Sequence, residues 1–247
     1  GGFDAINIYG DEALGGGNDY DNLAAVTDFP SYAGLGKYYR TGYREEDLVD
    51  YDTRNLKTNF GLYYRITPEV EISYNFNYGA GTTVYQGENR FSLKDINFYQ
   101  NVVEVRKKDK FFVKAYATNE DAGNSYDMRF TGINLAKVNA NEWFGSYIQN
   151  YLGATIGGQN NEQAHAFARI QADDAYTLQP GTAEFNTAYD QIIDNPDVNE
   201  GSKFVDQTKM YVGEGNYNFR SLLKDYMDLQ VGGSYRQYSL NSDGTIF

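Results

Sequence analysis

The sequence contains no cysteine, which excludes disulfide bonds, thiolate metal sites and thiol-based catalysis. It has one histidine, His165, so a histidine triad or a multi-histidine zinc site is hard to assemble. No run approaches the ~20 consecutive apolar residues that a membrane-spanning helix needs. A membrane β-barrel is not excluded, because its strands are apolar only at every second residue.

Basic residues are scarce: 21 Lys and Arg stand against 34 Asp and Glu, which gives a net charge of −13. Phosphate binding requires clustered Lys and Arg, so nucleic acid is not an expected partner. Proline is also scarce, with 4 residues, whereas Tyr (24), Phe (15) and Gly (26) are abundant. This composition favours a β-rich protein.

The stretch VEISYNFNYGAGTTV, residues 70–84, alternates apolar and polar side chains with a period of two. Such alternation predicts a strand with one apolar and one polar face. Residues 55–66 alternate in the same way, and Thr67, Pro68 and Glu69 between the two stretches read as a turn. The two segments therefore predict an antiparallel hairpin.

Further strands are expected at residues 93–106 and 111–118, joined by a turn at 107–110, and at 211–219 and 227–238, joined by a turn near Ser221. In the stretch between these pairs, the apolar residues instead recur at the spacing of an amphipathic helix. Helices are predicted around residues 141–153, ending at Gly153, around 163–171, and around 183–194 with Thr182 as N-cap.

These elements predict four segments: an extracellular loop region (1–54), four barrel strands in two hairpins (55–120), a long extracellular loop subdomain with short helices (121–207), and a barrel hairpin with the start of the next loop (208–247). Short turns at one end and long loops at the other are typical of outer-membrane barrels. Polar faces rich in Asn and Gly suit a wet lumen. We therefore expect an all-β fold, an antiparallel transmembrane β-barrel segment. A soluble sandwich, whose apolar faces meet in a core, is the alternative.

Six segments carry a family resemblance: GGFDAINIYGDE (1–12), NDYD (18–21), GYREEDLVDYDTRNLKTNFGLYYRI (42–66), YQGENRFSLKDI (85–96), NEDAGNSYD (119–127) and LQVGGSYRQYSLNSDGTIF (229–247). Their amino-acid sequences resemble those of the TonB-dependent outer-membrane receptors. The resemblance is to the branch with a carboxypeptidase-regulatory-like N-terminal extension, related to the SusC-type nutrient transporters. It covers nearly the whole chain, except that residues 154–203 are unspecific, and it includes no catalytic signature.

The resemblance implies a barrel of about 22 strands with a plug in its lumen, in the outer membrane of a Gram-negative bacterium. It also implies nutrient uptake, with substrate bound between extracellular loops and plug, and energy supplied by the TonB complex through an N-terminal box. The implied partners are outer-membrane lipid, the rest of the receptor chain with its plug, the TonB complex and, for SusC-type pairs, a surface lipoprotein. With six expected strands, no plug and no TonB box, the chain is expected to be an interior fragment of the barrel of such a receptor.

Within that framework, Lys57, Arg65 and Arg236 are candidates for lumen residues that contact the plug; guiding an anionic substrate is the alternative role. Trp143, Phe144 and Tyr147 are candidates for a substrate-stacking site. Packing in the core of the long loop is the commoner role for such aromatic residues.

The remaining chemistry is sparse. The charged run at residues 44–52 is expected to be solvated loop, and His165 is expected to pack or lie at the surface. DNPDVNEG (194–201) offers oxygen ligands but lacks the D-x-D-x-D-G order of a calcium loop, so no cofactor is expected and a loop Ca²⁺ is the alternative. Catalysis is not expected. The alternative functions are a secreted or surface β-rich binding protein (an adhesin or carbohydrate-binding module) and, with less support, an enzyme using loop carboxylates.

Overall fold

The computed structural model describes residues 8–11, 35–36, 38, 40–87, 89–224 and 226–246. The chain divides into two compact units. The helical unit comprises the described parts of Gly1–Tyr51, Val84–Ser92 and Tyr126–Lys203; the sheet unit comprises Asp52–Thr83, Leu93–Ser125 and Phe204–Phe247. Of the predicted loop region 1–54, residues 1–7 and 12–34 lie outside the described residues.

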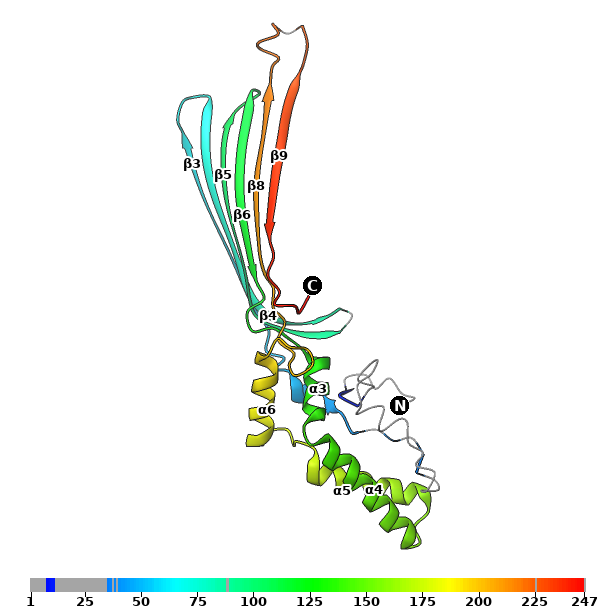
Figure 1. Cartoon of the computed structure of the whole chain (residues 1–247). Helices are drawn as coiled ribbons and strands as arrows, with labels where there is room; N and C mark the ends of the chain where they lie inside the picture. The colour runs from blue at the N-terminus through cyan, green and yellow to red at the C-terminus, as the bar shows by residue number, and fades with distance from the viewer. Residues whose placement is uncertain are drawn as a thin grey trace. The chain divides into compact units, whose positions relative to one another are not determined.

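Six long strands build the sheet: β3 (Arg54–Arg65), β4 (Val70–Gln86), β5 (Arg90–Lys107), β6 (Phe111–Asp121), β8 (Gln207–Asn218) and β9 (Gln230–Ser239). They lie in the order β3-β4-β5-β6-β8-β9. Figure 1 shows them side by side, from cyan to red. The prediction of a mainly antiparallel β fold is confirmed at this level. Within the described residues the sheet is open, with β3 and β9 at its edges.

Two of the connections between neighbouring strands are tight turns. Residues 66–69 form the first, where the Thr67 hydroxyl accepts a 3.1 Å hydrogen bond from the Val70 amide and Pro68 occupies a turn position. Residues 108–110 form the second, in which the Lys110 amide donates to the Lys107 carbonyl at 3.1 Å. Both turns were expected from their Pro, Lys and Asp content.

The connection between β8 and β9 differs from its prediction. It spans residues 219–229, whereas a short turn near Ser221 was expected, and β9 begins at Gln230 rather than at Met227. The Phe219 amide donates to the Leu229 carbonyl at 2.8 Å, and the Leu222 amide donates back to the Phe219 carbonyl at 2.9 Å. Local turns thus use the backbone groups that a longer ladder would have needed.

The helical unit contains short strands and five helices among its described residues. The strands are β1 (Ile8–Tyr9), which pairs with β2 (Tyr43–Arg44), and β7 (Tyr126–Asp127); the helices are α2 (Glu45–Leu48), α3 (Met128–Lys137), α4 (Ala140–Ile156), α5 (Asn161–Tyr176) and α6 (Ala183–Asp194). The three predicted helices correspond to α4, α5 and α6. Thr182 caps α6 as predicted, its hydroxyl accepting from the Phe185 amide at 3.2 Å.

One helix end was predicted wrongly and one helix was not predicted. Helix α4 does not end at Gly153, because the Gly153 carbonyl accepts a 2.9 Å bond from the Gly157 amide and the helix continues to Ile156. Helix α3 was not predicted. Its start is fixed by the side chain of Asp127, which accepts hydrogen bonds from the amides of Arg129 and Phe130 at 2.8 and 3.1 Å.

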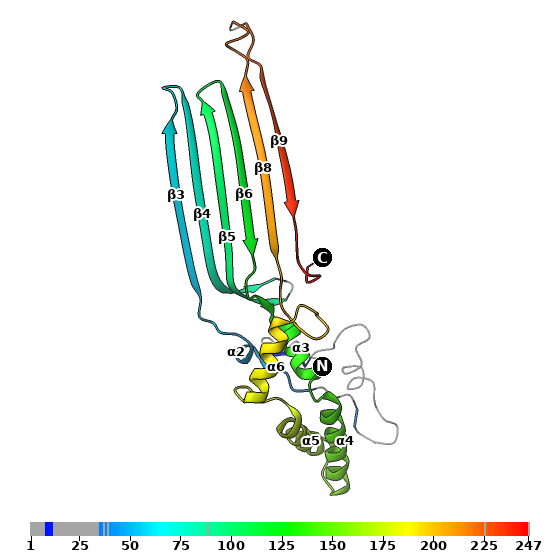
Figure 2. The ribbon, with the colours of Figure 1, turned by 60° about the vertical axis from the view of Figure 1, so that its left-hand side comes forward.

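Helices α4 and α5 lie side by side, as Figure 2 shows. Helix α5 turns Ala164, Ala168 and Ala172 inward, and these three residues are fully buried. Small side chains on one helix allow the large aromatic residues of its neighbour to fill the interface. This core is described with the site below.

Among the described residues, no helix has the length and apolar character needed to cross a membrane.

Candidate functional site

The most prominent chemical feature of the sheet is the separation of its two faces. The β3–β4 register sets Leu62 opposite Tyr74 and Phe60 opposite Phe76 on one face. On β6 the same face holds Val113 and Ala115; neighbours across the ladders include Val105, Val103, Gly215, Gly213 and Tyr235. Side chains that repeat at every second residue reach one face of every strand. The register therefore gathers the apolar residues of six strands into one continuous apolar face.

The apolar face has a sharp boundary on three adjacent strands. Along β6 it runs from Phe111 through Ala117 and changes to Asn119. Asn119 pairs with Lys209, and Lys209 pairs with Ser239, so the polar residues lie in one row. Counted to the polar row itself, the stretch from Phe111 to Asn119 is nine residues, the lower limit of the ~9–11 residues that a tilted strand needs to cross a bilayer. We call this stretch of the face the apolar band.

The apolar band is exposed. Leu62, Tyr64, Val113 and Tyr235 are each more than half accessible. Asn101 is a polar side chain within the band, and its carbonyl oxygen accepts a 2.7 Å hydrogen bond from the Tyr74 hydroxyl. Large exposed apolar surfaces on proteins mark contacts with another protein or with a membrane.

The opposite face is polar and carries cross-strand ion pairs. Glu71 lies between two guanidinium groups, 2.8 Å from Arg106 and 3.8 Å from Arg65. Farther across the sheet, Lys114 pairs with Glu214 at 3.4 Å. Ion pairs between side chains that water still reaches contribute little stability each, so these pairs affect the charge pattern of the face more than the stability of the fold.

The three predicted lumen residues all belong to this polar face. Arg65 takes part in the pair with Glu71, Lys57 lies opposite Gly79, and Arg236 lies opposite Val212, its guanidinium donating to the Tyr238 hydroxyl at 3.3 Å. Lys57 and Arg65 share β3, whereas Arg236 is on β9, at the other edge of the sheet. The structure thus places them on one face without bringing them together.

Two clefts lie on the polar face near the tight turns. One, of about 730 Å³, is lined by Arg65, Glu71 and Arg106 among others. The other, of about 750 Å³, includes Lys114 and Glu214. Both clefts mix cations with carboxylates, so neither concentrates one sign of charge.

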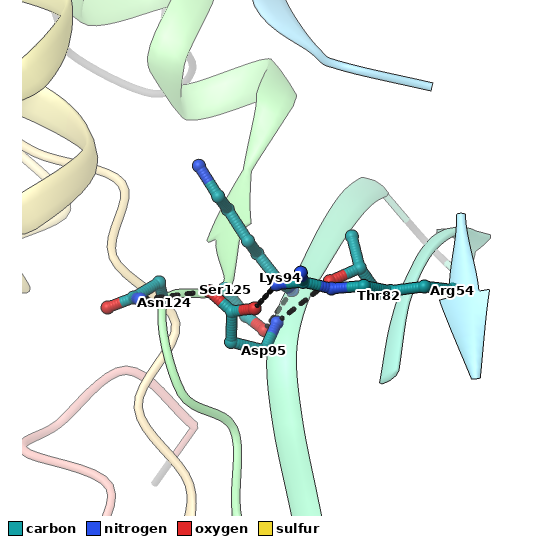
Figure 3. Close-up of polar contacts among 6 residues, drawn as sticks. All are labelled: Arg54, Thr82, Lys94, Asp95, Asn124 and Ser125. Carbon is teal, nitrogen blue, oxygen red and sulfur yellow. Dashed lines mark hydrogen bonds and ion pairs between the residues drawn. The ribbon is translucent and has the colours of Figure 1, made fainter. Parts of the chain in front are cut away.

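A polar junction lies toward the opposite end of the strands, within the sheet unit (Figure 3). Asp95 is its centre and has a left-handed backbone conformation, with φ of 57°. Its amide donates to the Thr82 hydroxyl at 3.1 Å, and its carboxylate accepts from the side chains of Arg54 and Asn124, the latter at 3.2 Å. One residue thereby links the start of β3, β4, β5 and the loop after β6.

A second set of bonds fixes the loop after β6 against β5. The Lys94 amide donates to the Ser125 hydroxyl at 2.9 Å, and the Asn124 amide donates to the Lys94 carbonyl at 2.8 Å. Gly123, between them, has φ of 62°, and a Cβ there would lie 2.7 Å from the Lys94 carbonyl oxygen. Only glycine fits this position without moving the backbone.

We expect Gly123→Ala to lower the free energy of unfolding of the sheet by at least about 2 kcal/mol, because the alanine adopts a disfavoured backbone conformation and meets the β5 carbonyl groups. Thermal unfolding followed by circular dichroism measures this change. Gly213→Ala is the matched control, since its Cβ would meet nothing within 4 Å. Equal losses in the two variants would contradict the role given to the junction.

The aromatic candidates of the long loop form the core of the helical unit. Trp143, Phe144 and Tyr147 on α4 are buried, and Tyr38 stacks on Tyr147 with ring centroids 4.2 Å apart. The Trp143 indole donates to a carboxylate oxygen of Asp173 at 2.8 Å. In this arrangement the three rings present no face on which a substrate could stack, which favours the packing role.

His165 also packs in this core. Its Nδ1 lies 2.9 Å from the Tyr147 hydroxyl, and its ring centroid lies 4.5 Å from that of Tyr151. Among the described residues, no group of three or more His, Asp or Glu side chains is arranged to hold a metal ion. In the stretch 194–201, where a loop Ca²⁺ was the alternative to no cofactor, the Asp197 carboxylate accepts a 2.9 Å hydrogen bond from the Asn199 amide.

The charged run at residues 44–52 was expected to be solvated, and one of its residues corrects that prediction. Glu45, in α2, is buried and accepts hydrogen bonds from the hydroxyls of Tyr51 and Tyr9 at 2.7 and 3.1 Å and from the Arg90 guanidinium at 3.1 Å. Burial alone would raise the pKa of Glu45, but these three donors outweigh it and hold the pKa below its usual value. Burial, together with the Glu45 charge, raises the pKa of Tyr9 to about 12.

We expect Glu45→Gln to lower the free energy of unfolding of the helical unit by about 3 kcal/mol at neutral pH, because it removes the counter-charge of a largely buried Arg90. Since the pKa of Glu45 is lowered on folding, its contribution is complete above the unfolded value near 4.5 and is lost as pH falls through the folded value. The difference between the two proteins should therefore shrink in acid.

Fluorescence of the single tryptophan, Trp143, reports unfolding of this unit directly. Glu46→Gln is the matched control, because the Glu46 side chain is 54% exposed and pairs with the exposed Arg44. We expect this control to change stability by less than about 0.5 kcal/mol at any pH. A Glu45→Gln effect that is independent of pH would contradict the assignment of a charged Glu45.

Sequence reasoning missed Glu45, Asp95 and Gly123. Two of the partners of Glu45, Tyr9 and Arg90, are distant in sequence, and an aspartate in the left-handed conformation leaves no pattern in the chain. The turn that contains Gly123 could have been predicted from the run NEDAGNS, because Asp, Gly and Asn favour turns.

Comparison with known proteins adds no relative: no protein-family model matches the chain, and no curated protein or solved structure shows significant similarity to it.

Proposed function

We propose that this chain forms part of the wall of an outer-membrane β-barrel that takes up a nutrient, as in the TonB-dependent transporters that its sequence resembles. The exposed apolar band carries the proposal. On β6 its length, counted to the polar row, fits a bilayer, its boundary is in register across β6, β8 and β9, and the opposite face is polar and ionic. In a transmembrane barrel the first face contacts lipid and the second faces the lumen.

The open edges of the sheet support the same proposal. Strands β3 and β9 leave their outer backbone groups without a partner strand among the described residues. Lipid does not satisfy such groups, so a spanning sheet must close. We propose that further strands of the same protein close it, to about 22 in total, and that a plug occupies the lumen against the polar face.

In this proposal the protein is a transporter in the outer membrane of a Gram-negative bacterium, and it catalyses no reaction. Lys57, Arg65 and Arg236 face the plug, and the helical unit belongs to an extracellular loop. The partners are lipid, the plug, the TonB complex and, if the protein is of SusC type, a surface lipoprotein. The alternative, a secreted or surface-displayed binding protein, would need a second apolar surface to cover the band.

Two genetic backgrounds test the proposal. Cells that lack this protein and cells that lack the TonB complex are compared for growth across a panel of nutrients at limiting concentration. We expect both to lose growth on the same nutrient, and the protein to fractionate with the outer membrane and to require detergent for extraction. A protein released in water without detergent, or a growth defect that TonB loss does not reproduce, would contradict it.

A further inference from the structure

The connection between β8 and β9 is the feature that the proposed function leaves unexplained. It runs over residues 219–229, whereas the other two turns at this end of the sheet span 66–69 and 108–110. A hairpin needs only 2–5 residues to reverse its direction. The extra length, here called the long turn, therefore serves something other than reversal.

The long turn exposes large apolar side chains. Tyr226 is 92% accessible, Leu222 61% and Met227 58%. Single exposed apolar residues are ordinary, but three large ones within one connection suggest a contact surface.

The position of the long turn indicates what it contacts. At the end of β8 the Asn218 amide donates to the Lys110 carbonyl at 2.7 Å, so the strand stops level with the tight turn at 108–110. The last rings of the apolar face also lie here: Phe111 stacks on Tyr217 with centroids 6.5 Å apart, and Tyr217 contacts Phe219 at 4.7 Å. The long turn thus begins where the apolar band ends.

We propose that the long turn lies in the headgroup region of a phospholipid bilayer, with Leu222, Tyr226 and Met227 inserted among the lipids. The inference rests on the proposed function, because it requires the apolar band to span the membrane. Tyrosine is favoured at that depth, since its ring is apolar and its hydroxyl reaches water. Lys224, in the same turn, has a side chain long enough to keep its charge in water at that depth.

Charge does not drive this insertion. The long turn contains Arg220, Lys224, Asp225 and Asp228, so its net charge is zero, and Arg220 lies 4.0 Å from Asp228. Attraction to acidic lipids needs an excess of Lys and Arg. The turn should therefore insert into zwitterionic phosphatidylcholine as well as into bilayers that contain acidic lipid.

Spin labels test the depth of the long turn. The complete gene product, in a background without other cysteines, carries one label at a time through Leu222→Cys, Tyr226→Cys, Lys108→Cys or Tyr235→Cys and is reconstituted in phosphatidylcholine vesicles. Collision with lipid-soluble oxygen is compared with collision with a water-soluble nickel complex. Lys108 is the matched control, exposed in the tight turn at the same end; Tyr235 reports the apolar band.

We expect the oxygen-to-nickel ratio at positions 222 and 226 to exceed that at position 108 at least about fivefold, and to change little when acidic lipid is added. A ratio equal to that at position 108, or labels shielded from both probes as in a protein contact, would overturn the inference. If position 235 is in lipid while 222 and 226 are in water, only this inference fails. If position 235 is in water, the proposed function fails as well.

Discussion

An arginine introduced at Leu62 should prevent stable insertion of this protein into the outer membrane. Leu62 lies on β3 in the middle of the apolar band and opposite Tyr74. At the bilayer midplane an arginine on the lipid face costs about 2–4 kcal/mol, because the charge loses its hydration. Leu62→Arg is therefore expected to reduce the amount of folded protein in the outer-membrane fraction severalfold.

Two controls on the same strand separate lipid depth from general damage. Tyr63→Arg puts the same charge on the polar face at the same height, and Thr58→Arg puts it on the apolar side near the row where the band ends. The penalty falls to about 0–1 kcal/mol near the membrane interface, where Thr58→Arg would lie, and the Tyr63→Arg charge faces the wet lumen instead of lipid, so both controls should insert almost normally. Similar losses in all three variants would contradict a lipid-facing band.

The second large effect is expected at Trp143. Its ring lies 5.1 Å from that of Tyr147 and 5.2 Å from that of Phe144, and the Arg40 guanidinium is 5.4 Å from its centre. Truncation of a buried tryptophan leaves a cavity and typically costs 3–5 kcal/mol. Trp143→Ala should therefore unfold the helical unit at a much lower temperature, as measured by circular dichroism.

The same position distinguishes a packing role from a substrate-binding role. Trp143→Phe keeps an aromatic ring in the core but removes the hydrogen bond to Asp173, so we expect a small loss of stability and unchanged nutrient uptake. Phe167→Ala on α5 is the control for the alanine variant, because Phe167 is exposed and should contribute less than about 0.5 kcal/mol. Loss of uptake by a folded Trp143→Phe protein would support a binding role instead.

The face separation of the sheet could be predicted because it depends only on the alternation of residues along each strand. Residues 70–84 alternate strictly, and the register that pairs Leu62 with Tyr74 follows from the short turn that contains Thr67. Helix α6 was predictable for a similar reason, since its apolar residues have helical spacing and Thr182 caps it.

Other features depend on residues that are distant in sequence. Glu45 belongs to a charged run that usually lies in water, and its burial depends on Arg90, 45 residues away. The left-handed conformation of Asp95 depends on Thr82, Arg54 and Asn124 from three other segments. Single-sequence patterns report local periodicity, so they do not carry such contacts.

The length of the long turn was predicted wrongly for a different reason. Leu222 and Leu223 precede Lys224 in a stretch whose composition resembles the edge of a strand, and Met227 and Leu229 continue the alternation of β9. The local hydrogen bond from the Leu222 amide to the Phe219 carbonyl ends the ladder earlier than the alternation suggests. Hydrophobic alternation fixes the face of a residue more securely than the end of its strand.

The central claim is that the apolar face contacts lipid, and a scan of β6 in native membranes tests it most directly. Single cysteines at positions 111–119 are reacted with a membrane-impermeant and a lipid-soluble maleimide. The account predicts that odd-numbered positions from 111 to 117 react only with the lipid-soluble reagent, that even-numbered positions react with the impermeant one, and that the alternation ends at position 119. Impermeant labelling of the odd positions, or equal protection of all nine, would contradict it.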